Sequence, residues 1–126
     1  MEEIKKVIED LGIEAFESSM NIAGLAVMSD SGKLIFQTEN WDLAEETKNI
    51  LAVINGDSSL NIGGITFSVS QATSEGIITT NKGGMGHVII VPFQGGFLLS
   101  YAMSQADAEK VINFLKTNVG KLSGKF

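Results

Sequence analysis

The stretch from residue 62 to residue 103 restricts the fold more than any other part of the chain, because it consists of apolar and β-branched runs separated by short breaks. Four runs are predicted as β-strands, at 62–71, 76–80, 86–93 and 97–103. Breaks of this length are too short for the crossover that parallel neighbours need, so the strands are expected to form an antiparallel sheet. In the last break, Gly95-Gly96 suits a two-residue hairpin turn because both glycines tolerate positive φ.

A helix and a hairpin are predicted ahead of these strands. Apolar residues recur at positions 4, 7, 8 and 11, which is the spacing of a one-sided helix, and a further turn or two is expected after Gly12. Residues 22–28 and 33–38 are predicted as two strands, and the polar turn between them indicates a hairpin. A second helix is expected from about 42 to 55, with Glu45 and Glu46 in its first turn.

The last helix is predicted to begin at Ser104, with Asp107 completing a capping box. An apolar stripe continues from Ala108 to Leu122, and 123–126 is expected to be a frayed tail. Helices at both ends can cover a sheet. The sequence therefore predicts an α+β fold with a single domain over 1–126, an antiparallel sheet of about six strands and a helix after the first hairpin.

Composition makes several classes of function improbable. The 126 residues are 44% hydrophobic and include no cysteine, which excludes disulfides, thiolate metal sites and cysteine nucleophiles. The formal net charge is −6 and all nine basic residues are lysines, so neither nucleic acid nor an anionic membrane is an expected partner. The N-terminus lacks the pattern of a signal peptide and no apolar run approaches the length of a membrane span, so a cytoplasmic protein is expected.

Residues with catalytic chemistry are sparse. His87 is the single histidine and lies in a predicted strand, where it is expected to pack or face solvent rather than act as a general base. The run 82–86 (KGGMG) is superficially similar to a phosphate-binding loop, but it joins two strands and does not begin a helix, so its glycines are interpreted as turn residues. Metal ligands at useful spacing are absent from the sequence. No cofactor and no enzymatic activity are expected, which leaves binding as the function.

A series of weak motifs follows in a consistent order along the chain. Residues 60–69 (LNIGGITFSV) combine a leucine, a Gly-Gly pair and an aromatic strand, and the glycine-rich hairpin 81–86 and the strand ending at Ser100-Tyr101 come next. Gln105 and 111–115 (VINFL) match the start and core of a C-terminal helix, and 32–41 matches a second strand leading to an aromatic residue. In this order the motifs resemble the profilin family over nearly the whole chain.

The resemblance implies a function and a binding face. Profilins bind the barbed-end cleft of monomeric actin with the outer strands of their sheet and the start of the last helix. We therefore expect this chain to bind monomeric actin or an actin-like protein and to regulate actin polymerisation. Carried over by position, the actin-binding residues would come from one strand, the hairpin and the last helix: Thr66, Ser68, Val69, Gln71, Lys82, Gly84, Gly86, Ser104, Gln105 and Lys110.

One departure from the family pattern concerns charge. Profilins place several lysines or arginines on the actin-binding face, whereas this chain keeps one of these cations, Lys82. The other corresponding positions are neutral: Thr66, Gln71, Thr79 and Asn81. Charges at the rim of an interface mainly steer association and set its salt dependence. Slower and weaker binding to a eukaryotic actin, or a partner with a different charge pattern, is therefore expected.

A second departure concerns polyproline, which profilins bind on an aromatic platform because flat rings grip the ridges of a polyproline II helix. Ile35 stands at the strand position of a platform tryptophan, the first helix has no Trp or Tyr, and Phe114 is what remains of the platform. Polyproline binding is expected to be weak or absent. Phosphoinositide binding is not expected either, because the chain is acidic and lacks arginine.

Three features are shared with the compact profilins of Asgard archaea: the short turn between Tyr101 and Gln105, the absence of cysteine and the reduced platform. Profilins usually act as monomers, so a monomer is expected.

Two alternatives to a profilin stay open at the level of sequence. A roadblock or longin-type domain has a related order of elements but three strands after the middle helix, and it acts as a homodimeric scaffold or regulator of small GTPases. A PAS-like sheet domain would need a pocket with converging polar groups.

Overall fold

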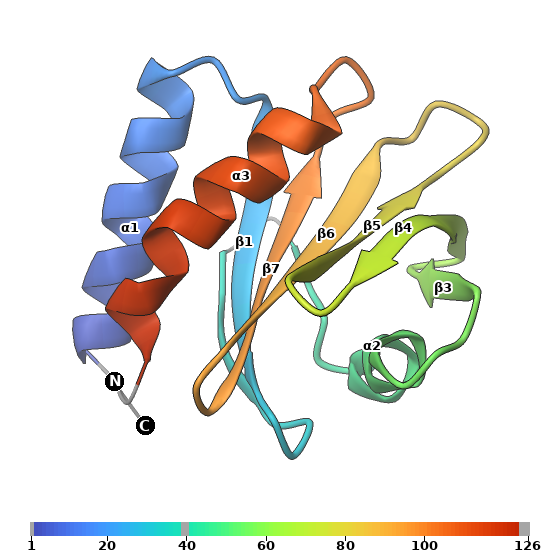
Figure 1. Cartoon of the computed structure of the whole chain (residues 1–126), viewed down its shortest axis with the longest axis horizontal. Helices are drawn as coiled ribbons and strands as arrows, with labels where there is room; N and C mark the ends of the chain where they lie inside the picture. Colours follow the sequence, from blue (N-terminus) through green and yellow to red (C-terminus); the bar gives the residue numbers. More distant parts are fainter. Residues whose placement is uncertain (1, 39–40, 124–126) are drawn as a thin grey trace.

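The computed structural model describes residues 2–38 and 41–123. Its elements follow in the order α1 (Glu2–Glu17), β1 (Ile22–Ser29), β2 (Leu34–Gln37), α2 (Thr47–Ile54), β3 (Ser59–Ile62), β4 (Ile65–Thr73), β5 (Gly76–Thr80), β6 (His87–Phe93), β7 (Gly96–Ala102), α3 (Ala108–Asn118) and a short 3₁₀ helix, η1 (Val119–Leu122) (Figure 1). The strands form one antiparallel sheet in the order β2-β1-β7-β6-β5-β4-β3. The α+β fold predicted from the sequence is confirmed.

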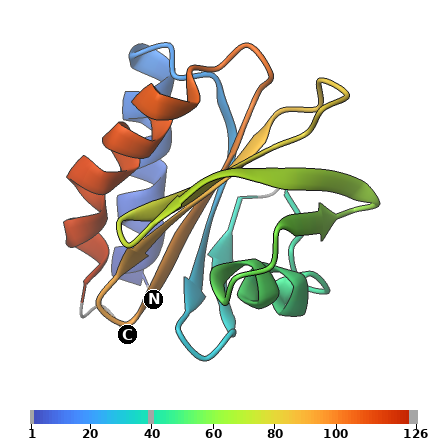
Figure 2. The ribbon, with the colours of Figure 1, turned by 45° about the vertical axis from the view of Figure 1, so that its right-hand side comes forward.

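The three α-helices are divided between the two faces of the curled sheet. The terminal helices α1 and α3 lie side by side on one face, and α2 lies beyond the other face near β3 (Figures 1 and 2). Each face therefore has its own apolar core. We call them the terminal-helix core and the α2 core.

The terminal-helix core confirms the helical spacing seen in the sequence. Ile4, Ile8 and Leu11 of α1 are buried almost completely, and Val111 and Leu115 of α3 are buried beside them. The α2 core is built in the same way from Ile50 and Val53 of α2, together with these residues of the strands and the preceding segment: Ala26, Met28, Trp41, Leu43, Leu60, Ile62, Phe67, Val88, Ile90 and Leu99.

In the described residues the sheet has seven strands, in place of the predicted number of about six. The predicted strand over 62–71 proves to be a hairpin, in which Ile62 of β3 pairs with Ile65 of β4. Gly63 and Gly64 form its two-residue turn with φ of 58° and 82°. Most residues other than glycine would be strained there, so the Gly-Gly pair marks a turn rather than the interior of a strand.

The starts of two helices also differ from the prediction. Helix α2 begins at Thr47 instead of near residue 42, so Glu45 and Glu46 precede its first turn. Helix α3 begins at Ala108 rather than Ser104, because the Asp107 side chain caps it by accepting hydrogen bonds from the backbone N–H groups of Glu109 and Lys110. The predicted capping box is therefore wrong.

The β6–β7 hairpin is confirmed, but its turn lies one residue earlier than predicted. The register pairs Phe93 with Gly96, so the turn consists of Gln94 and Gly95, and Gly96 is the first residue of β7. Of the tail predicted at 123–126, Ser123 is described and its N–H donates a hydrogen bond to the carbonyl of Gly120 (3.3 Å), whereas 124–126 lie outside the described residues. In the part of the chain that the structure describes, no helix is long and apolar enough to cross a membrane, and no group of side chains could hold a metal ion.

Candidate protein-binding surface

Part of the sheet face that carries the terminal helices is left uncovered and is polar. The register places Ser68, Thr80 and His87 directly opposite one another, in line with Ala102, which belongs to the terminal-helix core. Directly paired residues share a face of the sheet. Thr66, two residues before Ser68, lies on this same face, and its hydroxyl donates a hydrogen bond to the Asn61 side chain over 2.6 Å.

A β-bulge brings Gln71 to this face. Simple alternation along β4 would place Gln71 with Phe67 and Val69 on the side of the α2 core. The pairing of β4 with β5 shifts by one residue between Val69 and Gln71, so Gln71 lies opposite Ile78 of the terminal-helix core. Val69 itself packs against the α2 core. Of the four β4 residues assigned to the binding face from the sequence, the structure brings together Thr66, Ser68 and Gln71 and places Val69 on the opposite face.

The loop between β5 and β6 is organised by one side chain, that of Asn81. Its carboxamide oxygen accepts hydrogen bonds from the backbone N–H groups of Gly83 (2.8 Å) and Met85 (3.1 Å), and its amide nitrogen donates one to the carbonyl of Thr66 (2.8 Å). The loop is thereby tied to β4 and held in one shape. Lys82 and Gly84 are exposed at its tip, and Gly84 adopts a φ of 87°.

The same loop is also fixed to β7. Gly86 lies so close to β7 that a Cβ atom there would collide with the carbonyl oxygen of Ala102, and its φ is 108°. The Tyr101 hydroxyl donates a hydrogen bond to the carbonyl of Met85. The Tyr101 ring stacks on Trp41 of the α2 core, with ring centroids 6.0 Å apart. Tyr101 therefore connects the loop to the α2 core.

The loop between β7 and α3 lies at the same end of the sheet (Figure 1). Ser104 and Gln105 are exposed on it. Its backbone is held by two hydrogen bonds of Met103, whose N–H donates to the carbonyl of Asn21 (2.8 Å) and whose carbonyl accepts from the N–H of Ala106 (2.9 Å). We define the end surface as the polar face of β4–β6 and these two loops: Thr66, Ser68, Gln71, Thr80, 81–87 and 103–105.

Lys110 and Phe114 lie apart from the end surface. Both line a hollow between α1 and α3, together with Glu14 and Met20 of the opposite segment. Phe114 is largely buried there, at 9% exposure. The loop that precedes α3 therefore belongs to the end surface. Lys110, within α3 itself, lies on the side of the helix that faces α1.

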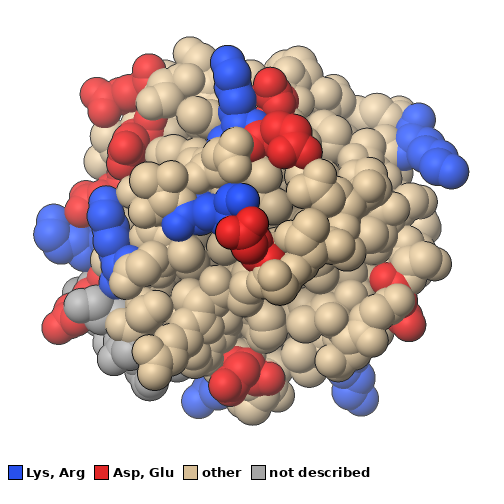
Figure 3. Space-filling view, viewed as in Figure 1, with Lys and Arg blue, Asp and Glu red and all other residues tan. Residues whose placement is uncertain are grey.

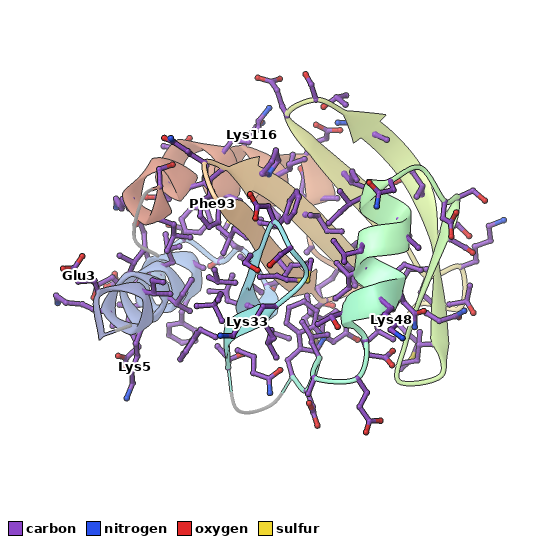
Figure 4. The ribbon with its side chains drawn as sticks, turned by 90° about the horizontal axis from the view of Figure 1, so that it is seen from below. Glu3, Lys5, Lys33, Lys48, Phe93 and Lys116 are labelled. Atoms are coloured by element: carbon purple, nitrogen blue, oxygen red, sulfur yellow. The ribbon has the colours of Figure 1, made fainter. Side chains whose placement is uncertain are left out.

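Charge is distributed unevenly over the molecule. Charged side chains gather over the terminal helices, and a broad neutral area lies over the strands beside α3 (Figure 3). Within the end surface, Lys82 is the one residue with a formal charge. Lys5, Lys33, Lys48 and Lys116 lie on separate elements around the molecule and form no common basic face (Figure 4).

Comparison with known proteins decides the family. A scan against models of known protein families finds no match. Loki profilin-1 of Lokiarchaeum sp. (strain GC14_75) is 32% identical to this chain, over 97% of the chain and 96% of the relative's length. The chain belongs to the profilin family. Odin profilin of Odinarchaeota yellowstonii (strain LCB_4) is 31% identical to this profilin over 71% of the chain and 76% of its own length.

A solved structure with the same fold supports the assignment. The crystal structure of the complex of Loki profilin-1 with rabbit actin contains a chain that superposes on this profilin with a TM-score of 0.89 at 30% identity, covering 100% of this chain and 98% of the other. The resemblance to profilins that the sequence predicts is therefore confirmed, as is its similarity to archaeal members of the family.

Several residues of the end surface were not identified from the sequence of this profilin. Asn81 was interpreted as the neutral replacement of a charge, but it organises the whole β5–β6 loop. An asparagine that begins a glycine-rich break is a known turn signal, so this role could have been found. The exposed side chains of Met85 and Met103 carry no such signal, because methionine in a strand-rich sequence is expected to be buried.

His87 is half-buried at the start of β6. Its Nδ1 atom lies 3.0 Å from the Thr80 hydroxyl, and both residues belong to the end surface. A nucleophile, a base and a third group that orients the base would have to converge for covalent catalysis. In the strand register His87 lies between Thr80 and Ala102, and Ser68 lies beyond Thr80, so the polar groups beside it are hydroxyls that suit hydrogen bonding.

Proposed function

We propose that this profilin binds monomeric actin, or an actin-like protein, through the end surface and thereby regulates actin polymerisation. It acts as a cytoplasmic, single-domain monomer without a cofactor or an enzymatic activity. The proposal rests on one observation above all: neutral hydrogen-bonding side chains from β4–β6 and two fixed loops converge at one end of the sheet. It is supported by the similarity to profilins whose structures were solved in complexes with rabbit actin.

The geometry of the end surface suits a protein partner. Backbone that is already ordered by Asn81 and Tyr101 loses little conformational entropy on binding. Thr66, Ser68 and Gln71 can exchange hydrogen bonds with a partner without desolvating a charge. Because Lys82 is the one residue of the end surface with a formal charge, electrostatic steering contributes little to association.

The test is the spontaneous polymerisation of pyrene-labelled rabbit actin with increasing amounts of this profilin. Dose-dependent suppression of nucleation is expected. Lys82→Glu and Gln71→Glu should each weaken it by about threefold to tenfold, because each adds a negative charge facing the partner. Lys48→Glu on α2 makes the same charge reversal on the other side of the molecule and should leave suppression unchanged.

A negative result would also be informative. No effect on rabbit actin or on an archaeal actin homologue, together with a dimer in light scattering, would contradict the proposal and favour a homodimeric scaffold. The structure does not favour that alternative, because in the described part of the chain five strands follow α2, whereas a roadblock domain has three.

A further inference from the structure

Exposed apolar side chains are concentrated in two places. Of the large hydrophobic residues in the described part of the chain, Phe16 (86% exposed), Ile13 (60%), Met85 (49%) and Met103 (42%) are the most exposed. Ile13 and Phe16 lie on α1, away from the sheet. Met85 and Met103 lie on the two loops of the end surface, at the ends of the paired strands β6 and β7.

The backbone of both methionines is fixed. The N–H of Met85 donates to Asn81 and its carbonyl accepts from the Tyr101 hydroxyl. The N–H and the carbonyl of Met103 are likewise both hydrogen-bonded within the fold. Neither loop can withdraw its side chain from water by a small backbone shift without breaking these bonds. Both methionines are therefore about half exposed on a backbone that is fixed by hydrogen bonds.

This arrangement has the properties of a pair of binding anchors. Burial of a methionine side chain is favourable by the hydrophobic effect, and the unbranched thioether adapts to irregular apolar hollows. Preorganised backbone reduces the entropy lost on binding. Between the two loops, the end surface offers hydroxyl and amide groups and one lysine, so charge pairs can supply little of the affinity.

We propose that Met85 and Met103 are the principal apolar anchors with which this profilin holds its actin partner, each entering an apolar hollow on that partner. The inference rests on the proposed function. Actin is the occupant because the two side chains are continuous with the surface proposed to bind it. The contact then depends mainly on apolar burial, and its affinity changes little with salt.

The experiment measures the affinity for monomeric rabbit actin, kept from polymerising, by calorimetry with wild type, Met85→Ser, Met103→Ser and the double variant. Each single change should weaken binding about tenfold, and the pair by about fiftyfold or more. Replacement of both residues by leucine should keep the affinity within about threefold. For the wild type, the dissociation constant should change by less than about threefold between low and physiological salt.

The chain offers a matched control. Ile13→Ser with Phe16→Ser removes two exposed apolar side chains from α1, outside the end surface, and should leave the affinity within about twofold. Unchanged Trp41 fluorescence and unfolding midpoint would show that the loop variants keep their fold.

The failures of the two proposals are distinguishable. If the wild type binds actin and the affinity of the double serine variant is within about twofold of the wild-type affinity, the assignment of Met85 and Met103 as anchors is wrong. The proposed function then still stands. If wild type binds neither rabbit actin nor an archaeal homologue, the proposed function fails and the inference with it. A wild-type dimer that the double variant loses would make a second copy of this chain the occupant and overturn the inference.

Discussion

One face of the sheet is divided into two regions that do different work. Under α1 and α3 most of its residues are apolar and buried, as Leu25, Val27 and Leu98 are, with Ser100 as a buried polar exception. On β4 and β5 the same face carries Ser68 and Thr80, which are partly exposed and do not belong to the terminal-helix core. The strand pairing is continuous across both regions, so they differ in side-chain chemistry and in burial under the terminal helices, and not in the backbone pairing.

The largest expected effect tests this division directly. Leu98→Ala leaves a cavity in the terminal-helix core and should lower the free energy of unfolding by about 3 kcal/mol. Ser68→Ala on the uncovered region should change it by less than about 0.5 kcal/mol. Urea unfolding followed by the fluorescence of Trp41 measures both. Equal losses in the two variants would show that the uncovered region also carries the fold.

A smaller effect is expected where the two regions meet, at the close approach of Gly86 to β7. Gly86→Ala combines a positive φ with a collision against the carbonyl of Ala102, and should cost about 2 to 3 kcal/mol of unfolding free energy. Gly84 is the matched control, because it also has positive φ but no atom within 4 Å of an added Cβ. Gly84→Ala should cost about 1 kcal/mol. The same urea titration measures the loss of unfolding free energy in both variants. Equal losses would mean that the loop moves freely away from β7.

The two regions also differ in how far the sequence predicts them. The buried face of α1 depends on local spacing, so positions 4, 8 and 11 were correctly identified as core. The apolar pattern over 62–71 predicts one strand where the structure has a hairpin, although the Gly63-Gly64 pair, which has positive φ at both residues, is a turn signal. The fold class and the order of elements depend on many such local patterns, so one wrong strand boundary leaves both predictions correct.

The end surface depends on longer-range geometry. Gln71 lies on the face of the end surface because of a bulge that arises only when β4 pairs with β5, and no local pattern in β4 indicates it. Lys110 was placed with the binding residues from its position at the start of α3, but the rotation of the helix turns it toward α1. Met85 and Met103 are exposed on the loops at the ends of β6 and β7, which are brought together only when these two strands pair. These properties belong to the assembled sheet.

The smallest expected effect concerns polyproline. Trp41 is 7% exposed, covers Gly24 and stacks on Tyr101, while Phe114 lies in the hollow between α1 and α3. Neither ring is presented as part of a flat exposed platform, which polyproline recognition needs. A long polyproline peptide at up to about millimolar concentration should therefore leave the Trp41 fluorescence unchanged, whereas a profilin with a complete aromatic platform serves as the positive control. A saturable change would contradict this prediction. If Phe16→Ala then abolished that change, the peptide would bind on α1, and the second exposed apolar region of the molecule would have a partner of its own.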